Sequence, residues 1–298
     1  MLDKDLQAQF DSLLPGKSGD HGATRRGVIK LALGVGYAAT AMPIIAQTAI
    51  KTSAEGLKSG EISYLVNGFK VPAFYAAPAG KTNLPIVLVV HEIFGVHEYI
   101  ADVCNRFAQA GYMAIAPDCF ARQGDAAEYG EIAKLIANVV SKVPDAQVMA
   151  DLDGAVDWAS SNGGDLNKVA VTGFCWGGRI TWLYASHGPV KAAVAWYGRL
   201  VGIKNDKTPF NPIDRAANMK APVLGLYGGK DKGIPLDTLE AMKEALSRGG
   251  VSSKAAEFVI YPEAPHAFHA DYRSSYREDA AKDGMTKCLS WFKKHGVI

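Results

Sequence analysis

The sequence predicts an α/β fold in which a mostly parallel central sheet carries helices on both faces. Two observations lead to this class. From Glu61 onward, apolar runs typical of buried strands recur along the chain, and segments with helical spacing separate them. Strands that alternate with helices form parallel sheets, because right-handed crossovers return each strand beside an earlier one. No linker, repeat or low-complexity stretch interrupts this region, so we expect a single domain over residues 51–298.

The strands are expected to begin with a hairpin. The alternating segment 62–66 ends at Asn67-Gly68, a strong turn signal, and 71–75 returns as the second strand. Continuous apolar runs of the kind buried on both faces of a parallel sheet follow at 85–90, 112–116, 168–172, 191–196, 223–227 and 258–261. Helical spacing predicts helices at 99–110, 146–160, 179–185, 236–247 and 277–294.

Composition and charge exclude several functional classes. The formal net charge is +2, and no block of lysine or arginine follows the N-terminal region, so nothing indicates a nucleic-acid partner. Four cysteines without a C-x-x-C pair indicate neither a disulfide scaffold nor a zinc site. We expect no metal or cofactor. We expect Cys104, Cys119 and Cys288 to be small buried residues, with a Cys104–Cys119 bridge left open for an exported protein.

Residues 1–50 are predicted to be an export signal and leader. Arg25-Arg26 precede an apolar run, 31–46, that is too short to span a bilayer comfortably. The arginine pair indicates the bacterial twin-arginine route, so we expect a periplasmic protein that uses the twin-arginine export machinery and has no stable membrane anchor. Cleavage is expected between Met42 and Ser53. The alternatives are an amphipathic N-terminal helix and an uncleaved anchor.

The most informative motif is the stretch from Val169 to Gly178, a buried strand that runs into G-x-C-x-G and then into a helical segment. This pattern is typical of the nucleophile elbow of the α/β-hydrolase fold, with Cys175 at the apex of a strained turn. Glycines two residues to either side allow close approach of backbone and helix. The helix N-terminus favours a thiolate over a thiol. The alternative is a buried structural cysteine in an ordinary glycine-rich turn.

An acid and a base are expected later in the chain, just beyond the carboxyl ends of strands. Asp231 follows the strand 223–227, and His266 follows the strand 258–261. These two residues are therefore predicted as the orienting acid and the general base.

Three other residues compete for these roles. His269 is expected on the first turn of a following helix, and Asp237 at a helix N-terminus, where aspartate is favoured. Asp118 also follows a strand but precedes the nucleophile, so we interpret it as a loop-capping residue.

The oxyanion hole is expected from two backbone N–H groups, those of Trp176 after the nucleophile and of Ile93 in the loop after the strand 85–90. The H-E pair in this loop is not a zinc motif, because H-E-x-x-H would need histidine where Gly95 stands. His97 is expected to cap the following helix or to lie exposed on it.

The chain resembles the dienelactone hydrolase (carboxymethylenebutenolidase) family from roughly residue 60 to its end. The resemblance rests on H-E-I-F-G at 91–95, P-D-x-F-A-R-Q at 117–123, G-F-C-W-G-G at 173–178, Y-G-G-K-D at 227–231 and H-A-F at 266–268. It implies an α/β-hydrolase fold, cofactor-free hydrolysis of an ester or lactone, and Cys175, Asp231 and His266 as the triad. It also implies that Glu92 is a carboxylate beside the nucleophile that accepts the thiol proton in the resting state.

The chain departs from this family in two ways. The export signal is not part of the family's usual cytosolic form, and the arginines that hold the substrate carboxylate are not evident. Ala270 stands four residues after the predicted base, where the family has one of these arginines. Lys134 and Arg273 are the candidate replacements, so we expect neutral esters or lactones to be suitable substrates.

The expected activity is hydrolysis of a small ester or lactone through a thioester on Cys175. The alternatives are another acyl hydrolase on the same fold, such as a thioesterase or peptidase, and a non-catalytic periplasmic binding protein.

Overall fold

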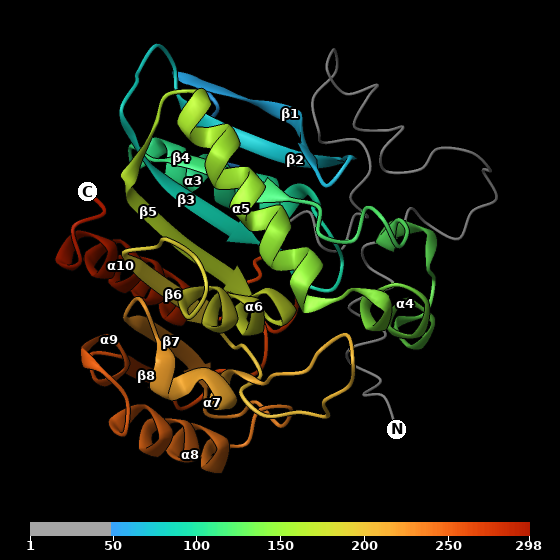
Figure 1. Ribbon diagram of the computed structural model, residues 1–298, viewed down its shortest axis with the longest axis vertical. Coiled ribbons are helices and arrows are strands. Elements are labelled where there is room, and N and C mark those ends of the chain that lie inside the picture. Colours follow the sequence, from blue (N-terminus) through green and yellow to red (C-terminus); the bar gives the residue numbers. More distant parts are fainter. Residues whose placement is uncertain (1–48) are drawn as a thin grey trace.

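The computed structural model describes residues 49–298 (Figure 1). The export signal and leader predicted for residues 1–50 therefore lie almost entirely outside the described part of the chain. Among the described helices, none is long and apolar enough to cross a membrane.

An eight-stranded sheet forms the centre of the molecule, in the order β1-β2-β4-β3-β5-β6-β7-β8. β2 is antiparallel to both of its neighbours, β1 and β4, and the strands from β4 to β8 are parallel, which confirms the predicted sheet. The strands are β1 (Leu57–Val66), β2 (Phe69–Pro78), β3 (Leu84–Val90), β4 (Met113–Pro117), β5 (Gly164–Phe174), β6 (Ala192–Trp196), β7 (Val223–Gly228) and β8 (Glu257–Tyr261).

The central strands are apolar because helices cover both of their faces. Every residue of β3, β4 and β6 is buried, whereas β8 at the sheet edge is mostly half-buried. Two strands begin earlier than predicted: β1 begins at Leu57, and β5 begins at Gly164. The first five residues of each strand are mostly polar and are half-buried or exposed, so the apolar pattern that marks the buried part of each strand does not reach its beginning.

Helices lie on both faces of the sheet. α5 and α6 cover the face that is in front in Figure 1, and α10 lies behind the sheet. α3 packs beside α10, where the rings of Phe107 and Phe292 are 6.1 Å apart. The helices are α3 (Glu98–Gln109), α4 (Ile132–Asn138), α5 (Asp145–Ser161), α6 (Trp176–Ala185), α7 (Pro212–Arg215), α8 (Leu236–Ser247), α9 (Val251–Lys254) and α10 (Glu278–Lys294).

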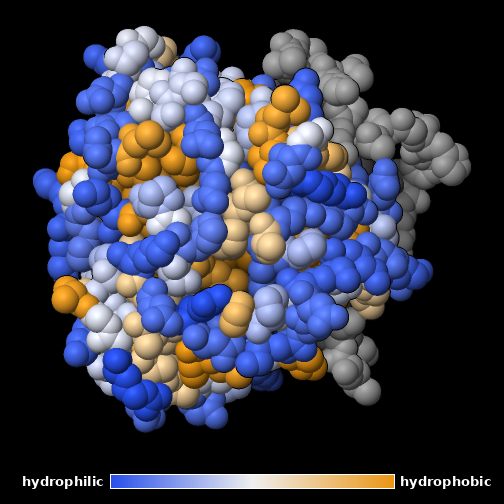
Figure 2. Space-filling view, in the orientation of Figure 1, coloured by the Kyte–Doolittle hydropathy of each residue, from blue (hydrophilic) through white to orange (hydrophobic). Residues whose placement is uncertain are grey.

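The outer faces of these helices are polar. The space-filling view shows a surface that is largely hydrophilic over the front helices, with hydrophobic residues in small separate groups (Figure 2). The longer helices agree with the predicted segments to within a few residues. The short helices α4, α7 and α9 were not predicted, because segments of this length carry no full apolar period.

The cysteines outside the predicted elbow are buried, as expected. Cys104, Cys119 and Cys288 are free thiols with no exposed surface, so the structure contains no Cys104–Cys119 bridge. Burial raises the pKa of each of these thiols.

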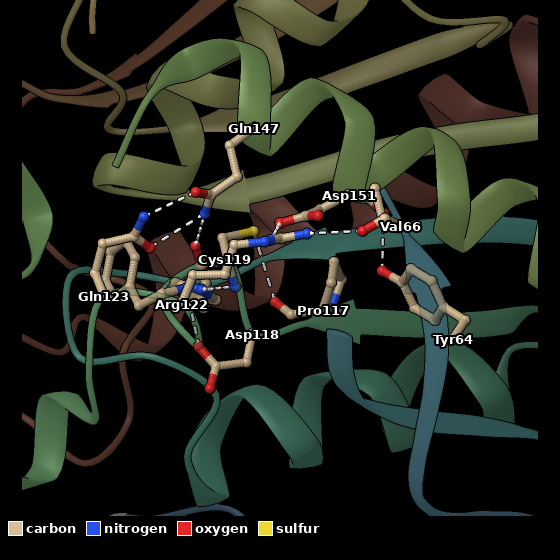
Figure 3. A network of polar contacts seen from close by, with 11 residues as sticks. Tyr64, Val66, Pro117, Asp118, Cys119, Arg122, Gln123, Gln147 and Asp151 are labelled. Carbon is tan, nitrogen blue, oxygen red and sulfur yellow. Dashed lines mark hydrogen bonds and ion pairs between the residues drawn. The ribbon is translucent and has the colours of Figure 1, made fainter. Parts of the chain in front are cut away.

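A polar network fixes the segment that follows β4 between the hairpin and α5 (Figure 3). Arg122 Nη1 lies 2.7 Å from Asp151 Oδ2, and the Asp151 side chain is fully buried. Tyr64 Oη donates to the backbone carbonyl of Asp151 over 2.8 Å. Gln147 Nε2 donates to the Cys119 carbonyl over 3.1 Å. These contacts tie residues 119–122 to α5 and, through Tyr64, join α5 to β1.

We expect Arg122→Met to destabilise the protein, because it leaves the Asp151 carboxylate buried without its cation. Breaking a buried ion pair on one side costs about 3–5 kcal/mol. We expect a loss at the lower end of this range, because the Arg122 side chain is 19% exposed and the ion pair is therefore not fully buried. Urea unfolding measures this loss. The double variant Arg122→Met/Asp151→Leu is the matched control and should recover part of the stability. Equal stability of the single and double variants would contradict the interpretation.

Candidate active site

Cys175 forms the turn between β5 and α6. β5 ends at Phe174 and α6 begins at Trp176, so a single residue reverses the chain. The backbone of Cys175 has φ 56° and ψ −112°, a conformation that residues with a side chain rarely adopt. Its N–H donates to the Trp196 carbonyl over 3.0 Å, which ties the turn to the end of β6. The strained strand-to-helix turn predicted at this position is therefore present.

Glycines allow α6 to lie directly against the strands. A Cβ atom on Gly173 would come within 2.4 Å of the Gly177 carbonyl oxygen, and one on Gly177 within 2.2 Å of the Val90 carbonyl oxygen. Both distances are far below van der Waals contact, so only glycine fits at these two positions. Val90 pairs with Gly173 in the register of β3 and β5. The loop after β3 therefore begins beside the turn that carries Cys175.

His266 and Asp231 meet beyond the carboxyl ends of β7 and β8. These neighbouring parallel strands end in register, with Gly228 opposite Tyr261, so the loops that follow them leave the sheet side by side. His266 Nδ1 lies 2.6 Å from Asp231 Oδ2. The other carboxylate oxygen of Asp231 accepts a hydrogen bond from the Gly233 N–H over 2.8 Å. Asp231 is thus fixed by its own loop and in turn fixes the imidazole ring.

The remaining nitrogen of His266 faces the cysteine. The side chain of His266 interacts with Cys175, and because Nδ1 is bound to Asp231, Nε2 is the nitrogen left for the sulfur. Burial by itself lowers the pKa of His266, but the negative charges of Cys175 and Asp231 outweigh burial and raise the pKa to about 10. At neutral pH this pKa favours the protonated imidazolium form of His266 beside the sulfur of Cys175.

The two N–H groups predicted for an oxyanion hole lie on adjacent segments. Trp176 is the first residue of α6, so the helix offers its N–H no acceptor. Ile93 lies in a turn after β3 that is closed by a hydrogen bond from the Gly95 N–H to the Glu92 carbonyl, over 3.3 Å. In the described part of the chain, neither N–H is bonded to a protein acceptor. Donors free for a substrate oxygen are what such a hole requires.

Glu92 is buried within a cluster of polar side chains. Tyr272 Oη donates to Glu92 Oε2 over 2.7 Å, and His97 Nε2 and Arg273 Nη2 each lie 3.5 Å from a carboxylate oxygen. Burial by itself raises the pKa of Glu92, but Arg273 and His97 lower it to about 2. This pKa makes Glu92 a weaker base than His266, and the expectation that Glu92 accepts the thiol proton stays a prediction.

The two candidate anchors for a substrate carboxylate lie in different surroundings. Arg273 is buried, donates from Nε to Tyr272 Oη over 2.9 Å, and pairs with Glu92. Its guanidinium, near Glu92 and Cys175, belongs to the site, but its charge is already matched by Glu92. Lys134 is exposed on α4 and pairs with Glu131. No contact among the described residues joins Lys134 to the cysteine or the histidine.

The competing histidines are engaged elsewhere. His269 is buried, and its Nδ1 lies 2.6 Å from Tyr99 Oη. Burial lowers its pKa to about 3, with a further contribution from Arg106. The prediction that His269 opens a helix was wrong, because it lies in a turn well before α10. His97 occupies the N-cap position of α3 but is buried against Glu92, so it is not exposed.

The competing acids have local structural roles, as predicted. Asp118 caps its own loop by accepting a hydrogen bond from the Phe120 N–H over 3.0 Å. Asp237 lies in the first turn of α8.

Sequence reasoning missed the aromatic residues of the site. Tyr197 follows β6 directly, has φ 39°, and packs its ring 5.1 Å from that of His266. Its place just beyond the carboxyl end of a strand is the same signal that identified Asp231 and His266. Tyr272, which holds Glu92, had no such signal, because it lies in an irregular segment far from any strand.

The described residues contain no group of three or more histidine, cysteine, aspartate or glutamate side chains that could hold a metal ion.

The mostly parallel sheet and the strained turn between β5 and α6 define an α/β-hydrolase. A histidine–aspartate pair beyond the carboxyl ends of β7 and β8 completes the arrangement typical of this class. The family model described as "Dienelactone hydrolase family" matches residues 71–296. The chain thus belongs to the dienelactone hydrolase family of ester and lactone hydrolases.

Individual relatives are similar over nearly their whole length. A protein of Methylorubrum extorquens is 52% identical over 290 residues, which cover 97% of this chain and 99% of the relative. One of Escherichia coli is 49% identical over 263 residues, or 88% of this chain and 96% of the relative. Both carry the name "Putative carboxymethylenebutenolidase". A crystal structure of a "Putative Dienelactone Hydrolase" from Klebsiella pneumoniae has 55% sequence identity to this chain and a TM-score of 0.77. The match covers 80% of this chain and 99% of the Klebsiella chain.

We expect the imidazole of His266 to stay protonated well above neutral pH, with a midpoint near its pKa of about 10. Cys175→Ala removes one of the two charges that raise this pKa, so the midpoint should fall toward the ordinary value of 6.5. NMR titration of the histidine ring signals measures both values. His269, with a pKa of about 3, provides an internal control that should not titrate in this range. A midpoint for His266 that is unchanged in Cys175→Ala would show that the sulfur carries no charge beside it.

Proposed function

We propose that this protein hydrolyses a small carboxylic ester or lactone with Cys175 as nucleophile, His266 as general acid and base, and Asp231 as the residue that orients the histidine. The observation that carries the proposal is the 2.6 Å contact between His266 Nδ1 and Asp231 Oδ2, because it leaves Nε2 directed at the sulfur. The strained backbone of Cys175 adds support, since such conformations are concentrated at functional sites.

In the proposed reaction, the Cys175 thiolate attacks the carbonyl carbon, and a bond between sulfur and carbon forms. The N–H groups of Ile93 and Trp176 donate to the oxyanion that develops on the carbonyl oxygen. When the tetrahedral intermediate collapses, the carbon–oxygen bond to the alkoxide breaks, and the His266 imidazolium gives its proton to that alkoxide. The products of this half are the alcohol and a thioester on Cys175.

Water completes the cycle. Neutral His266 takes a proton from a water molecule, the resulting hydroxide attacks the thioester, and the sulfur leaves as a thiolate. The acid is released, and the pair of thiolate and imidazolium is restored. Asp231 keeps its contact with Nδ1 throughout, so that Nε2 always faces the reacting atoms.

Other acyl transfers use the same arrangement. A thioesterase or peptidase differs from an ester hydrolase in its leaving group and not in its nucleophile. We favour an ester or lactone, because the names of the relatives refer to a butenolide or dienelactone. A purely binding role fits less well, because a binding protein gains nothing from holding a cysteine in a strained conformation.

We expect Cys175→Ala to abolish turnover of a nitrophenyl ester and His266→Ala to be about as damaging, because residues of a triad act as a unit. His269→Phe should retain far more activity, since His269 is buried against Tyr99 and does not face the sulfur. Steady-state kinetics with circular dichroism as the folding control measures the ranking. More than a trace of activity in Cys175→Ala, or a greater loss in His269→Phe than in His266→Ala, would refute the assignment.

The substrate preference follows from the state of Arg273. Its guanidinium is buried and already paired with Glu92, and position 270, where the family has an arginine, carries a buried alanine. A substrate carboxylate placed here would need to displace Glu92 from its partner. We therefore propose that neutral esters or lactones are the preferred substrates.

We expect the specificity constant for a neutral ester to equal or exceed that for a matched ester with one free carboxylate. A charge-assisted hydrogen bond contributes about 1.5–3 kcal/mol, so a working carboxylate anchor would instead favour the charged ester by roughly ten- to a hundred-fold. The kcat/KM values of the matched pair measure the difference. Strong preference for the carboxylated member would overturn the proposal, and Arg273→Ala would then show whether Arg273 supplies the anchor.

A further inference from the structure

His91 is a buried histidine that has no part in the proposed triad. It follows β3 directly and has no exposed surface. Its ring stacks on that of Trp176, with centroids 5.4 Å apart, and packs at a steep angle against that of Phe120, with centroids 4.6 Å apart. His91 therefore contacts one of the two residues whose N–H groups would bind the oxyanion, and it precedes the loop that supplies the other.

The contacts of the His91 ring define its tautomer. Nδ1 lies 2.6 Å from the backbone carbonyl oxygen of Glu92. A carbonyl oxygen can only accept, so Nδ1 carries the hydrogen. Nε2 lies 3.1 Å from the backbone nitrogen of Cys119, which can only donate, so Nε2 presents its lone pair. The ring is neutral in this arrangement, in keeping with burial, which lowers the pKa of His91.

The carbonyl that His91 holds belongs to the same peptide unit as the N–H of Ile93. A trans peptide is planar, and its C=O and N–H point in opposite directions. The hydrogen bond from Nδ1 to the Glu92 carbonyl, together with the longer bond from the Gly95 N–H to the same oxygen, therefore also fixes where the Ile93 N–H points. It draws electron density toward the carbonyl oxygen as well, which makes the N–H a stronger donor.

The other side of the His91 ring is anchored by the network of Figure 3. Gln147 on α5 donates to the Cys119 carbonyl, and Arg122, three residues further on, is paired with Asp151 on the same helix. Cys119 then donates its N–H to His91 Nε2. A continuous chain of hydrogen bonds thus leads from α5 through the segment after β4 to the peptide between Glu92 and Ile93.

We propose that His91 is a positioning residue of the oxyanion hole, whose Nδ1–H holds the peptide between Glu92 and Ile93 so that the Ile93 N–H donates to the substrate oxygen. The inference rests on the proposed function, since it assigns a role within the same reaction. His91 does not touch the reacting atoms and acts only through this peptide.

Two substitutions of His91 test the roles of its two ring nitrogens separately. In His91→Gln the side-chain amide extends to the place of Nε2, so it can still accept from Cys119 but no longer donates to the Glu92 carbonyl. In His91→Asn the amide nitrogen lies near the place of Nδ1, so this donor is kept. Loss of an entire oxyanion donor costs about 10²–10³ in kcat, so misalignment of one donor should cost roughly 10–100-fold.

We expect kcat for a nitrophenyl ester to fall roughly 10–100-fold in His91→Gln, with little change in KM. The hydrogen bond from the Ile93 N–H to the oxyanion forms only in the transition state, so its loss affects kcat and not substrate binding. His91→Asn should recover much of the loss. Alkylation of Cys175 by iodoacetamide is the control. It needs the thiolate but develops no oxyanion, so its rate should be the same in both variants and in the wild type.

The outcomes separate this inference from the proposed function. If the wild type is alkylated at Cys175 but turns over no ester or lactone, the proposed function fails and the inference fails with it. If the wild type is active, an unchanged kcat in His91→Gln, or equal losses of hydrolysis and alkylation, overturns the inference alone. Should His91→Gln not fold, the nitrogen NMR signals of His91 in the wild type decide: a protonated Nε2 would overturn the proposal.

Discussion

The candidate site depends on one constraint, the close packing of the N-terminus of α6 against the carboxyl ends of β3 and β6. Cys175 can make its strained turn only because Gly177 lets the helix approach the Val90 carbonyl and because the Trp196 carbonyl holds the Cys175 N–H. The same packing brings the loop after β3 beside the turn. The proposed nucleophile and the proposed oxyanion donors are therefore parts of one packing arrangement, and the strain in Cys175 is stabilised by the sheet around it.

The parts that follow a periodic or local pattern could be predicted from the sequence. Buried parallel strands appear as apolar runs, and the glycine spacing around Cys175 marks the turn, so the fold class and the approximate strand ends follow from the amino-acid order alone. His266 and Asp231 could be identified because both lie just beyond strand ends. Tyr197 has the same kind of position but was overlooked, since an aromatic residue after an apolar strand is easily interpreted as more core.

The buried polar cluster could not be predicted, because it joins residues that no local rule connects. Glu92 meets Tyr272 and Arg273, which lie 180 residues and more along the chain in a segment without regular structure. Which charges neutralise each other in such a cluster depends on side-chain directions that a sequence does not express. This is also why the sequence does not reveal that Glu92 is the partner of a buried guanidinium, which lowers the pKa of Glu92 to about 2.

The position of β8 has a consequence for how the site unfolds locally. This strand is at the sheet edge, is mostly half-buried, and pairs with β7 alone, yet the loop after it carries His266. Edge elements with few buried contacts open locally at a lower free energy than the whole domain. His266, the proposed general base, is therefore attached to a less protected part of the sheet than Cys175, which lies beside the fully buried strands β3 and β6. Partial opening at this edge would separate the histidine from the sulfur while most of the molecule is still folded.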